Sequence, residues 1–347
     1  MVRLRKISPA LLRLGVVGWL CLTCSRLSLA FAQVEQPAAA LQPPSASDAL
    51  IRAGVLIALM FVAGGFAFGP LVLAARSTEP LRIASASLRR RALWVGLICA
   101  AGAFALAFVE QAARSDAAGA LAGRSGPMFI ARVALLIALA VVLWRNRHES
   151  PFVLLPCCAL LFTQSLLSHS AAEPEWVLPT LADWVHILSA AVWLGGVAML
   201  ALIAPRALAD RAYSALGGAI RRFSPLATAC VLILALTGIM QSASFVGSFD
   251  ALVNTAYGRA LLAKLALFAV LVGFGAFHQY VISPRLNAWR ASAGDLSEAA
   301  RRFRVTILVE AGVGALILLA AGAMTALPPA RDFVAPSQAI VQLDKMC

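Results

Sequence analysis

The chain has 347 residues, of which 61% are hydrophobic and only 13% are charged, and its mean hydropathy is +0.85. A soluble domain carries about twice that charged fraction. Apolar runs of roughly 18 or more residues recur along the chain, and each can cross about 30 Å of hydrocarbon as a helix. The composition excludes a soluble globular domain and predicts an all-α, polytopic membrane protein.

The net charge of +13 does not indicate binding to nucleic acid. The basic residues stand in short clusters between the apolar runs, which is how a multi-pass membrane protein distributes Lys and Arg on its cytoplasmic side. The lipid bilayer is therefore the expected partner. The alternating loops that carry most of the arginines are expected in the cytoplasm, which places both mature termini in the periplasm of a bacterial inner membrane.

The N-terminus has the pattern of a cleavable signal peptide over residues 1–32. A basic start, Met1–Lys6, precedes the apolar stretch Leu14–Cys24, and Ala30-Phe31-Ala32 fits a small-x-small cleavage site. Residues 33–48, rich in Pro, Ala and Gln, are expected to form a disordered periplasmic lead.

Eight transmembrane helices are predicted after the signal peptide. Three fill residues 49–150, five fill residues 151–328, and a polar periplasmic tail covers residues 329–347. The expected helices are about Leu50–Ala74, Ala92–Gln111, Pro127–Trp144, Pro151–Ser168, Leu181–Ile203, Ser224–Val246, Arg259–Ile282 and Val305–Leu327.

Ionisable side chains inside a bilayer are costly, so each one suggests a functional site. His186 lies about four residues into its predicted helix, which places it roughly 6 Å below the outer surface. Small residues on the same helix, including Gly195 and Gly196, would allow a close approach by a neighbouring helix. His186 is therefore either a ligand or a histidine hydrogen-bonded across helices.

His169 closes the preceding predicted helix on the same side of the membrane, and it is a candidate second ligand. Met240 lies at similar depth, about two turns below the outer end of its helix, and Met324 lies near the outer end of the last helix. Imidazole together with thioether suits copper, particularly Cu(I). His169, His186 and Met240 are thus the candidate metal ligands, although a methionine in an apolar helix is more often a packing residue.

Two further groups of polar residues lie within the predicted spans. Lys264 either extends to the outer headgroups or faces the bundle interior, where Glu110 is a candidate partner. His278 and Glu310 lie toward the cytoplasmic side and would form an inner tier, either as an ion pair that anchors two helices or as an exit site for metal. His148, in a cytoplasmic loop, is expected to be solvated only.

Several stretches of the C-terminal half resemble the copper resistance protein D (CopD) family of bacterial inner-membrane proteins. These stretches are Asp183-Trp-Val-His186 through Gly195-Gly196, Thr237-Gly238, Asn254-Thr-Ala-Tyr257-Gly258 through Lys264, and Glu310 with Gly312. Ser168-His169-Ser170-Ala171 looks like the family's Gly-His-Ala with serine in place of glycine. The resemblance covers about residues 150–328, and the first three helices are similar in hydropathy only.

The resemblance implies a copper-binding protein that is not an enzyme and that imports copper for homeostasis and resistance. It implies that a periplasmic CopC-type copper carrier acts alongside, and that His169 and His186 are copper ligands. The outer loops, however, lack Met-rich or His-rich clusters, and no CopC-like β domain is fused to the chain. Copper specificity is therefore an implication of the family rather than of the number of ligands.

An alternative remains open. The last four helices also resemble HemJ-type protoporphyrinogen oxidases, in which a histidine early in one helix and a lysine in a later helix occupy similar surroundings. In that case the chain would be a membrane oxidoreductase that binds haem b, with His186 and Lys264 as axial ligands or substrate contacts. A purely structural partner subunit is a third interpretation.

Overall fold

The computed structural model describes residues 46–123, 125–168, 171, 176–286 and 293–332. Every regular element within these ranges is a helix, as the composition predicted. The predicted signal peptide and nearly all of the predicted lead and tail lie outside the described residues, so these three predictions are not tested.

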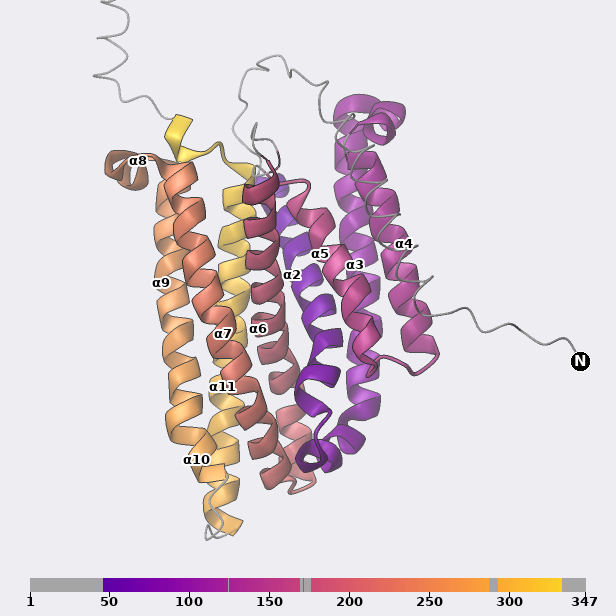
Figure 1. Ribbon diagram of the computed structural model, residues 1–347, viewed down its shortest axis with the longest axis vertical. Helices are drawn as coiled ribbons and strands as arrows, with labels where there is room; N and C mark the ends of the chain where they lie inside the picture. The colour runs from indigo at the N-terminus through magenta and orange to yellow at the C-terminus, as the bar shows by residue number, and fades with distance from the viewer. Residues whose placement is uncertain (1–45, 124, 169–170, 172–175, 287–292, 333–347) are drawn as a thin grey trace, which may run out of the picture. The chain divides into compact units, whose positions relative to one another are not determined.

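Seven helical stretches are long and apolar enough to cross a membrane, which makes the chain a multi-pass membrane protein (Figure 1). The first joins α2 (Ala46–Phe68) to the π-helical turn η1 (Gly69–Leu73), and the sixth joins α9 (Ala256–Phe277) to the π-helical turn η5 (His278–Ile282) and α10 (Ser283–Leu286). The other five are α3 (Glu79–Ala122), α4 (Ser125–Trp144), α6 (Val177–Ala209), α7 (Tyr213–Val246) and α11 (Ala293–Ala326).

The helix predicted over residues 151–168 is shorter than a membrane span. A 3₁₀ turn, η3 (Pro151–Val153), leads into α5 (Leu154–Ser165), and together they form an apolar helical stretch over Pro151–Ser165. At about 1.5 Å per residue this stretch is roughly 22 Å long, less than the about 30 Å of a bilayer core. The prediction of eight full spans is therefore not confirmed.

Several helices are longer than their apolar parts. α3 runs for 44 residues from Glu79, whereas hydropathy placed its start near Ala92. α6 begins at Val177 rather than near Leu181, and α7 begins at Tyr213 rather than near Ser224. Hydropathy detects only the part of a helix that suits lipid, while arginines and other good helix formers continue the same helix beyond it.

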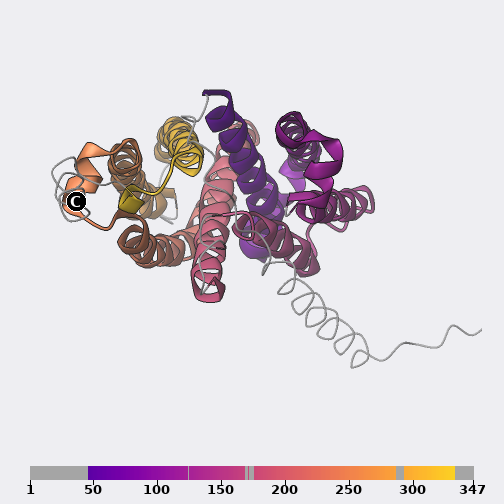
Figure 2. The same ribbon diagram turned by 90° about the horizontal axis from the view of Figure 1, so that it is seen from above.

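Helix α2 packs between α3 on one side and α6 and α11 on the other (Figures 1 and 2). Glycines make these contacts close: a Cβ added to Gly195 of α6 would lie 2.6 Å from Gly64 Cα of α2. A Cβ added to Gly322 of α11 would lie 2.5 Å from the Ala53 nitrogen of α2. The close approach predicted for the Gly195-Gly196 face is thus confirmed, and it holds α6 against α2.

Candidate metal centre

His186 faces Thr237 across the contact between α6 and α7. Its Nδ1 atom lies 2.8 Å from Thr237 Oγ1, and the Thr237 hydroxyl lies 2.7 Å from the Ile233 carbonyl oxygen one turn earlier in α7. Because α6 begins at Val177, His186 stands nine residues from the helix start, about 13 Å along the axis. It therefore lies farther along its helix than the predicted four residues.

The two hydrogen bonds together select one form of the imidazole. The Thr237 hydroxyl has a single hydrogen, which it donates to the Ile233 carbonyl, so its oxygen accepts from His186. Nδ1 of His186 therefore carries the proton, and Nε2 keeps its lone pair. No hydrogen bond to Nε2 is formed within the described residues, so this nitrogen is available to a metal ion.

Gly238, which follows Thr237 in α7, leaves space beside the His186 ring. A Cβ added to Gly238 would lie 3.8 Å from His186 Cε1. Trp193, two turns farther along α6, is buried and meets Phe268 of α9 edge-on with ring centroids 5.7 Å apart. The quoted motifs of α6 and α7 thus meet in space, because Thr237 and Gly238 both face the histidine.

A pair of opposite charges completes this site. The Asp183 carboxylate, one turn before His186, interacts electrostatically with the Lys264 ammonium of α9, and Lys264 also acts on His186. Ser168 hydrogen-bonds Asp183, and Ser165 Oγ, which has no partner of good hydrogen-bond geometry, faces the same carboxylate. The site therefore combines an imidazole, a carboxylate and an ammonium group.

The start of α9 explains the second quoted motif. Thr255 is the N-cap: its hydroxyl accepts a hydrogen bond from the Gly258 amide at 2.9 Å. A Cβ at Gly258 would lie 2.5 Å from the Leu252 carbonyl carbon, so only glycine fits there. The cap defines where α9 begins, nine residues before Lys264, and Tyr257 in the first turn interacts electrostatically with Asp183.

The structure places the other candidate ligands in different surroundings. His169 lies outside the described residues, so its role stays a prediction. Met240 is 49% exposed, so its side chain lies largely on the outside of the bundle, whereas Met324 is buried beside Leu261 and Tyr257. Among the described residues no group of three or more His, Cys, Asp or Glu side chains is placed to hold a metal ion. Of the three candidate ligands, His186 is therefore the only imidazole that the described part of the chain places in this site.

The predicted inner pair meets. His278, in the π-helical turn η5, has Nε2 at 2.7 Å from Thr306 Oγ1 and Nδ1 at 2.9 Å from Glu310 Oε2. Both side chains are buried, and the Glu310 contact is close without the alignment of a hydrogen bond. His278 follows Lys264 by 14 residues, about 21 Å along the helix, so this pair is separate from the outer site.

Two predictions about charged residues differ from the structure. Glu110 pairs with Arg114 at 2.9 Å, and the carboxylate that interacts with Lys264 is Asp183 instead. His148 is 8% exposed rather than solvated, and neither ring nitrogen has a hydrogen-bond partner. Burial and the nearby Arg89 charge lower the pKa of His148, so its ring is neutral.

Sequence reasoning missed Arg132, a buried arginine within the span formed by α4. Its Nε donates to Thr163 Oγ1 at 3.0 Å and its Nη2 to Gln164 Oε1 at 2.6 Å, while the guanidinium stacks 4.8 Å from the centre of the Phe104 ring. Arg132 therefore holds the last turn of α5, the turn that ends at Ser165 beside Asp183. The signal was available, since a single arginine inside an apolar run is expensive in lipid.

The helical bundle thus carries a half-buried imidazole beside a carboxylate and an ammonium group, and Nε2 of this imidazole makes no hydrogen bond within the described residues. These features define a multi-pass membrane protein with a polar site among its helices. Residues 217–324 match the family model described as copper resistance protein D. The chain is 29% identical over 213 residues to Copper transport protein CutJ of Bacillus subtilis (strain 168). This matched stretch covers 58% of this chain and 37% of that protein. It is 27% identical over 204 residues to Copper resistance protein D of Pseudomonas syringae pv. tomato, which covers 56% of this chain and 65% of that protein.

The resemblance to the copper resistance protein D family that the quoted motifs predicted is confirmed, since the family model matches the C-terminal part of the chain and both relatives are named as copper transport or copper resistance proteins. It spans less than two thirds of the length of either curated relative. No solved structure matches the chain.

Proposed function

We propose that this protein binds Cu(I) at Nε2 of His186 and carries copper inward across the bacterial inner membrane. This proposal rests on the relay from the Ile233 carbonyl through Thr237 to His186, which leaves Nε2 unprotonated and without a hydrogen-bond partner among the described residues. A neutral imidazole is a good ligand for copper, and thioether or a second imidazole would complete a soft site for Cu(I). His169 is the proposed second ligand, and Met240 would have to turn inward from its exposed position to become a third.

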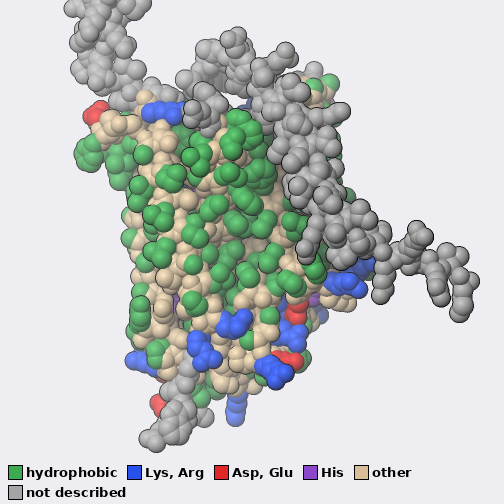
Figure 3. Space-filling view, viewed as in Figure 1, with side chains coloured by type: hydrophobic (Ala, Val, Ile, Leu, Met, Phe, Trp, Pro, Cys, Tyr) green, Lys and Arg blue, Asp and Glu red, His purple; other side chains and the backbone are tan. Residues whose placement is uncertain are grey.

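The proposed orientation of the protein follows from its charge distribution. Arginines gather toward one end of the face shown in Figure 3, and we place this end in the cytoplasm with both termini in the periplasm. His186 then lies toward the periplasmic side, where a CopC-type carrier would deliver copper. Copper would leave toward the inner tier of His278 and Glu310, whose contacts would have to open before either side chain could take part.

The test is Cu(I) binding by the purified full-length protein, measured by competition with a chromophoric chelator. His186→Ala removes the proposed ligand, so affinity should fall by more than about 100-fold, beyond the roughly 10- to 100-fold that loss of a ligand's hydrogen-bond partner costs. The matched control is His148→Leu, which removes a histidine at the other end of the bundle and should leave affinity unchanged. Unchanged binding by His186→Ala would refute the site.

A second candidate function is supported by the interaction of His186 with Lys264. Two nitrogen donors that reach one site are suitable axial ligands for haem b, and the protein would then be an oxidoreductase. An absorption spectrum of the purified protein separates the two functions, since haem gives a Soret band and Cu(I) is colourless. Substitution of His169 by alanine should impair copper handling and spare a haem held by His186 and Lys264.

A further inference from the structure

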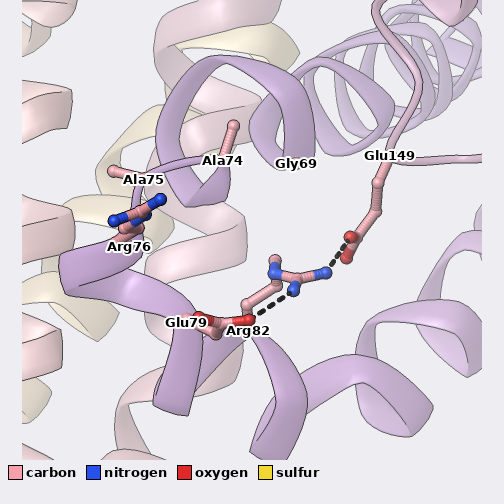
Figure 4. A pocket seen from close by; sticks show the side chains of 7 residues that line it. All are labelled: Gly69, Ala74, Ala75, Arg76, Glu79, Arg82 and Glu149. Atoms are coloured by element: carbon pink, nitrogen blue, oxygen red, sulfur yellow. Dashed lines mark hydrogen bonds and ion pairs between the residues drawn. The ribbon is translucent and has the colours of Figure 1, made fainter.

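The arginine-rich end of the bundle contains a cavity that the proposed copper site does not use. It measures about 320 Å³ and lies between the end of α2, the start of α3 and the loop that follows α4 (Figure 4). This volume is within the roughly 300–1,000 Å³ of small-molecule sites. Four charged side chains line it: Arg76, Glu79, Arg82 and Glu149.

The wall formed by Glu149 is held in place by two arginines. Arg89, which is almost fully buried, contacts Glu149 Oε1 at 2.6 Å, and Arg82 contacts Glu149 Oε2 at 2.7 Å. Burial raises the pKa of Glu149, but the hydrogen bonds from Arg89 and Arg82 outweigh burial and lower the pKa overall. Glu149 is therefore ionised at neutral pH.

The end of α2 is fixed as well. Arg222 of α7 donates from Nε to the Val72 carbonyl oxygen at 3.0 Å. Thr78, which is fully buried between α2 and α3, has its hydroxyl 2.8 Å from the Ala75 carbonyl oxygen. The cavity is thus formed by anchored elements before any ligand enters.

The charges around the cavity are arranged as a dipole. Arg76, on one side of the cavity, is exposed and makes no ion pair within the described part of the chain. On the other side, Glu79 Oε1 lies 3.3 Å from Arg82 Nη2, and the Glu79 side chain stays 53% exposed. Figure 4 shows Arg76 apart from the linked group of Glu79, Arg82 and Glu149. A ligand that fits carries one negative and one positive group a short distance apart.

The position of the cavity identifies the source of such a ligand. It lies at the end of the membrane-spanning part of α3, where lipid headgroups lie, and Ile83, next to Arg82, is 65% exposed toward the lipid. We propose that the cavity binds the phosphoethanolamine headgroup of a membrane lipid, with the phosphate at Arg76 and the ammonium at Glu79, the carboxylate that stays largely exposed. The acyl chains would continue along the apolar surface of α3.

The experiment measures lipid binding to the full-length protein in detergent by native mass spectrometry. Phosphatidylethanolamine is compared with phosphatidylcholine, whose methylated ammonium cannot donate hydrogen bonds, and with anionic phosphatidylglycerol. The wild-type protein should retain phosphatidylethanolamine roughly two- to fivefold more tightly than either, the range expected for exposed charge contacts. Equal retention of the three lipids would overturn the proposal.

Two variants at exposed positions give opposite patterns. Glu79→Gln removes a contact with the ammonium, so the preference for phosphatidylethanolamine should disappear and phosphatidylglycerol should bind more tightly than before. Arg76→Gln removes the phosphate contact, so all three lipids should weaken by a similar factor. A Glu79→Gln protein with unchanged lipid preference would contradict the assignment.

Two controls complete the design. Arg301→Gln removes an arginine that pairs with Glu298 on α11, and it should leave lipid binding unchanged. Soluble glycerophosphoethanolamine at the same concentration should fail to displace the lipid, because it lacks the acyl chains. Displacement at equal concentration would overturn a lipid as the occupant.

Discussion

The two histidines of the membrane interior have opposite hydrogen-bond states. His186 uses one ring nitrogen for Thr237, and its other nitrogen has no partner in the part of the chain that the structure describes, whereas His278 has Thr306 on one nitrogen and Glu310 on the other. An open nitrogen can bind a metal ion at once, while an occupied ring must first lose a partner. The comparison therefore favours the outer histidine as the first site for the proposed copper binding, since the inner histidine already contacts residues of another helix.

The largest expected effect comes from breaking the inner pair. Glu310→Ala leaves His278 without its carboxylate partner in a buried position, and loss of one partner of a buried ion pair costs about 3–5 kcal/mol. The measurement is the free energy of unfolding in detergent, with the double variant His278→Leu/Glu310→Leu expected to recover much of the loss. If Glu310→Ala instead abolished Cu(I) binding in a stable protein, the inner tier would be part of the metal site.

A smaller effect is expected at the outer site. Thr237→Val keeps the shape of the side chain but removes the acceptor that holds the proton on Nδ1 of His186. Copper affinity should fall roughly 10- to 100-fold, as it does when the hydrogen-bond partner of a histidine ligand is lost. Thr228→Val is the matched control, because Thr228 lies on the exposed side of the same helix and its hydroxyl donates a hydrogen bond to the Ser224 carbonyl oxygen. Equal affinity in both variants would show that the Thr237 hydrogen bond does not tune the site.

The smallest effect concerns a third histidine, whose two ring nitrogens both lack partners. His148→Leu removes these buried polar atoms and should stabilise the protein by about 1 kcal/mol. Because the pKa of His148 is lowered in the folded protein, the free energy of unfolding also depends on pH. It is unaffected by this group above pH about 6.5, the pKa of a free histidine, and it decreases as pH falls from there toward the folded-state pKa. The apparent Tm should therefore fall less between pH 7.5 and 5.5 in His148→Leu than in the wild-type protein, and an equal fall would contradict this explanation.

Much of the fold could be predicted because lipid imposes a simple rule on sequence. Apolar runs located the helices, and the glycines of α6 predicted a close approach by a neighbouring helix, which the structure shows to be α2. The polar ends of α3, α6 and α7 were not predicted, since hydropathy does not detect a helix that continues into water. The short α5 was overestimated because the residues after Ser165 are nearly as apolar as the helix itself.

The candidate site was predicted only as separate residues. His186, Lys264, Thr237 and Gly238 were each visible in the sequence, but the partner expected for Lys264 was Glu110, and the structure provides Asp183. Arg132 was missed because it stands alone among apolar residues on α4, in the part of the chain that contains none of the quoted motifs. Spacing within one helix identifies a shared face, but it does not say which other helix meets that face.

By itself the sequence determined the class of this protein, because a long apolar helix satisfies all of its own backbone hydrogen bonds within a bilayer. It also showed the resemblance to the copper resistance protein D family, through motifs that cap α9 and leave space beside His186. The tertiary structure alone decided which ring nitrogens of His186 and His278 have partners, which carboxylate interacts with Lys264 and where Arg132 donates its hydrogen bonds. These outcomes depend on contacts between helices distant in the chain, and they are set by how the helices pack.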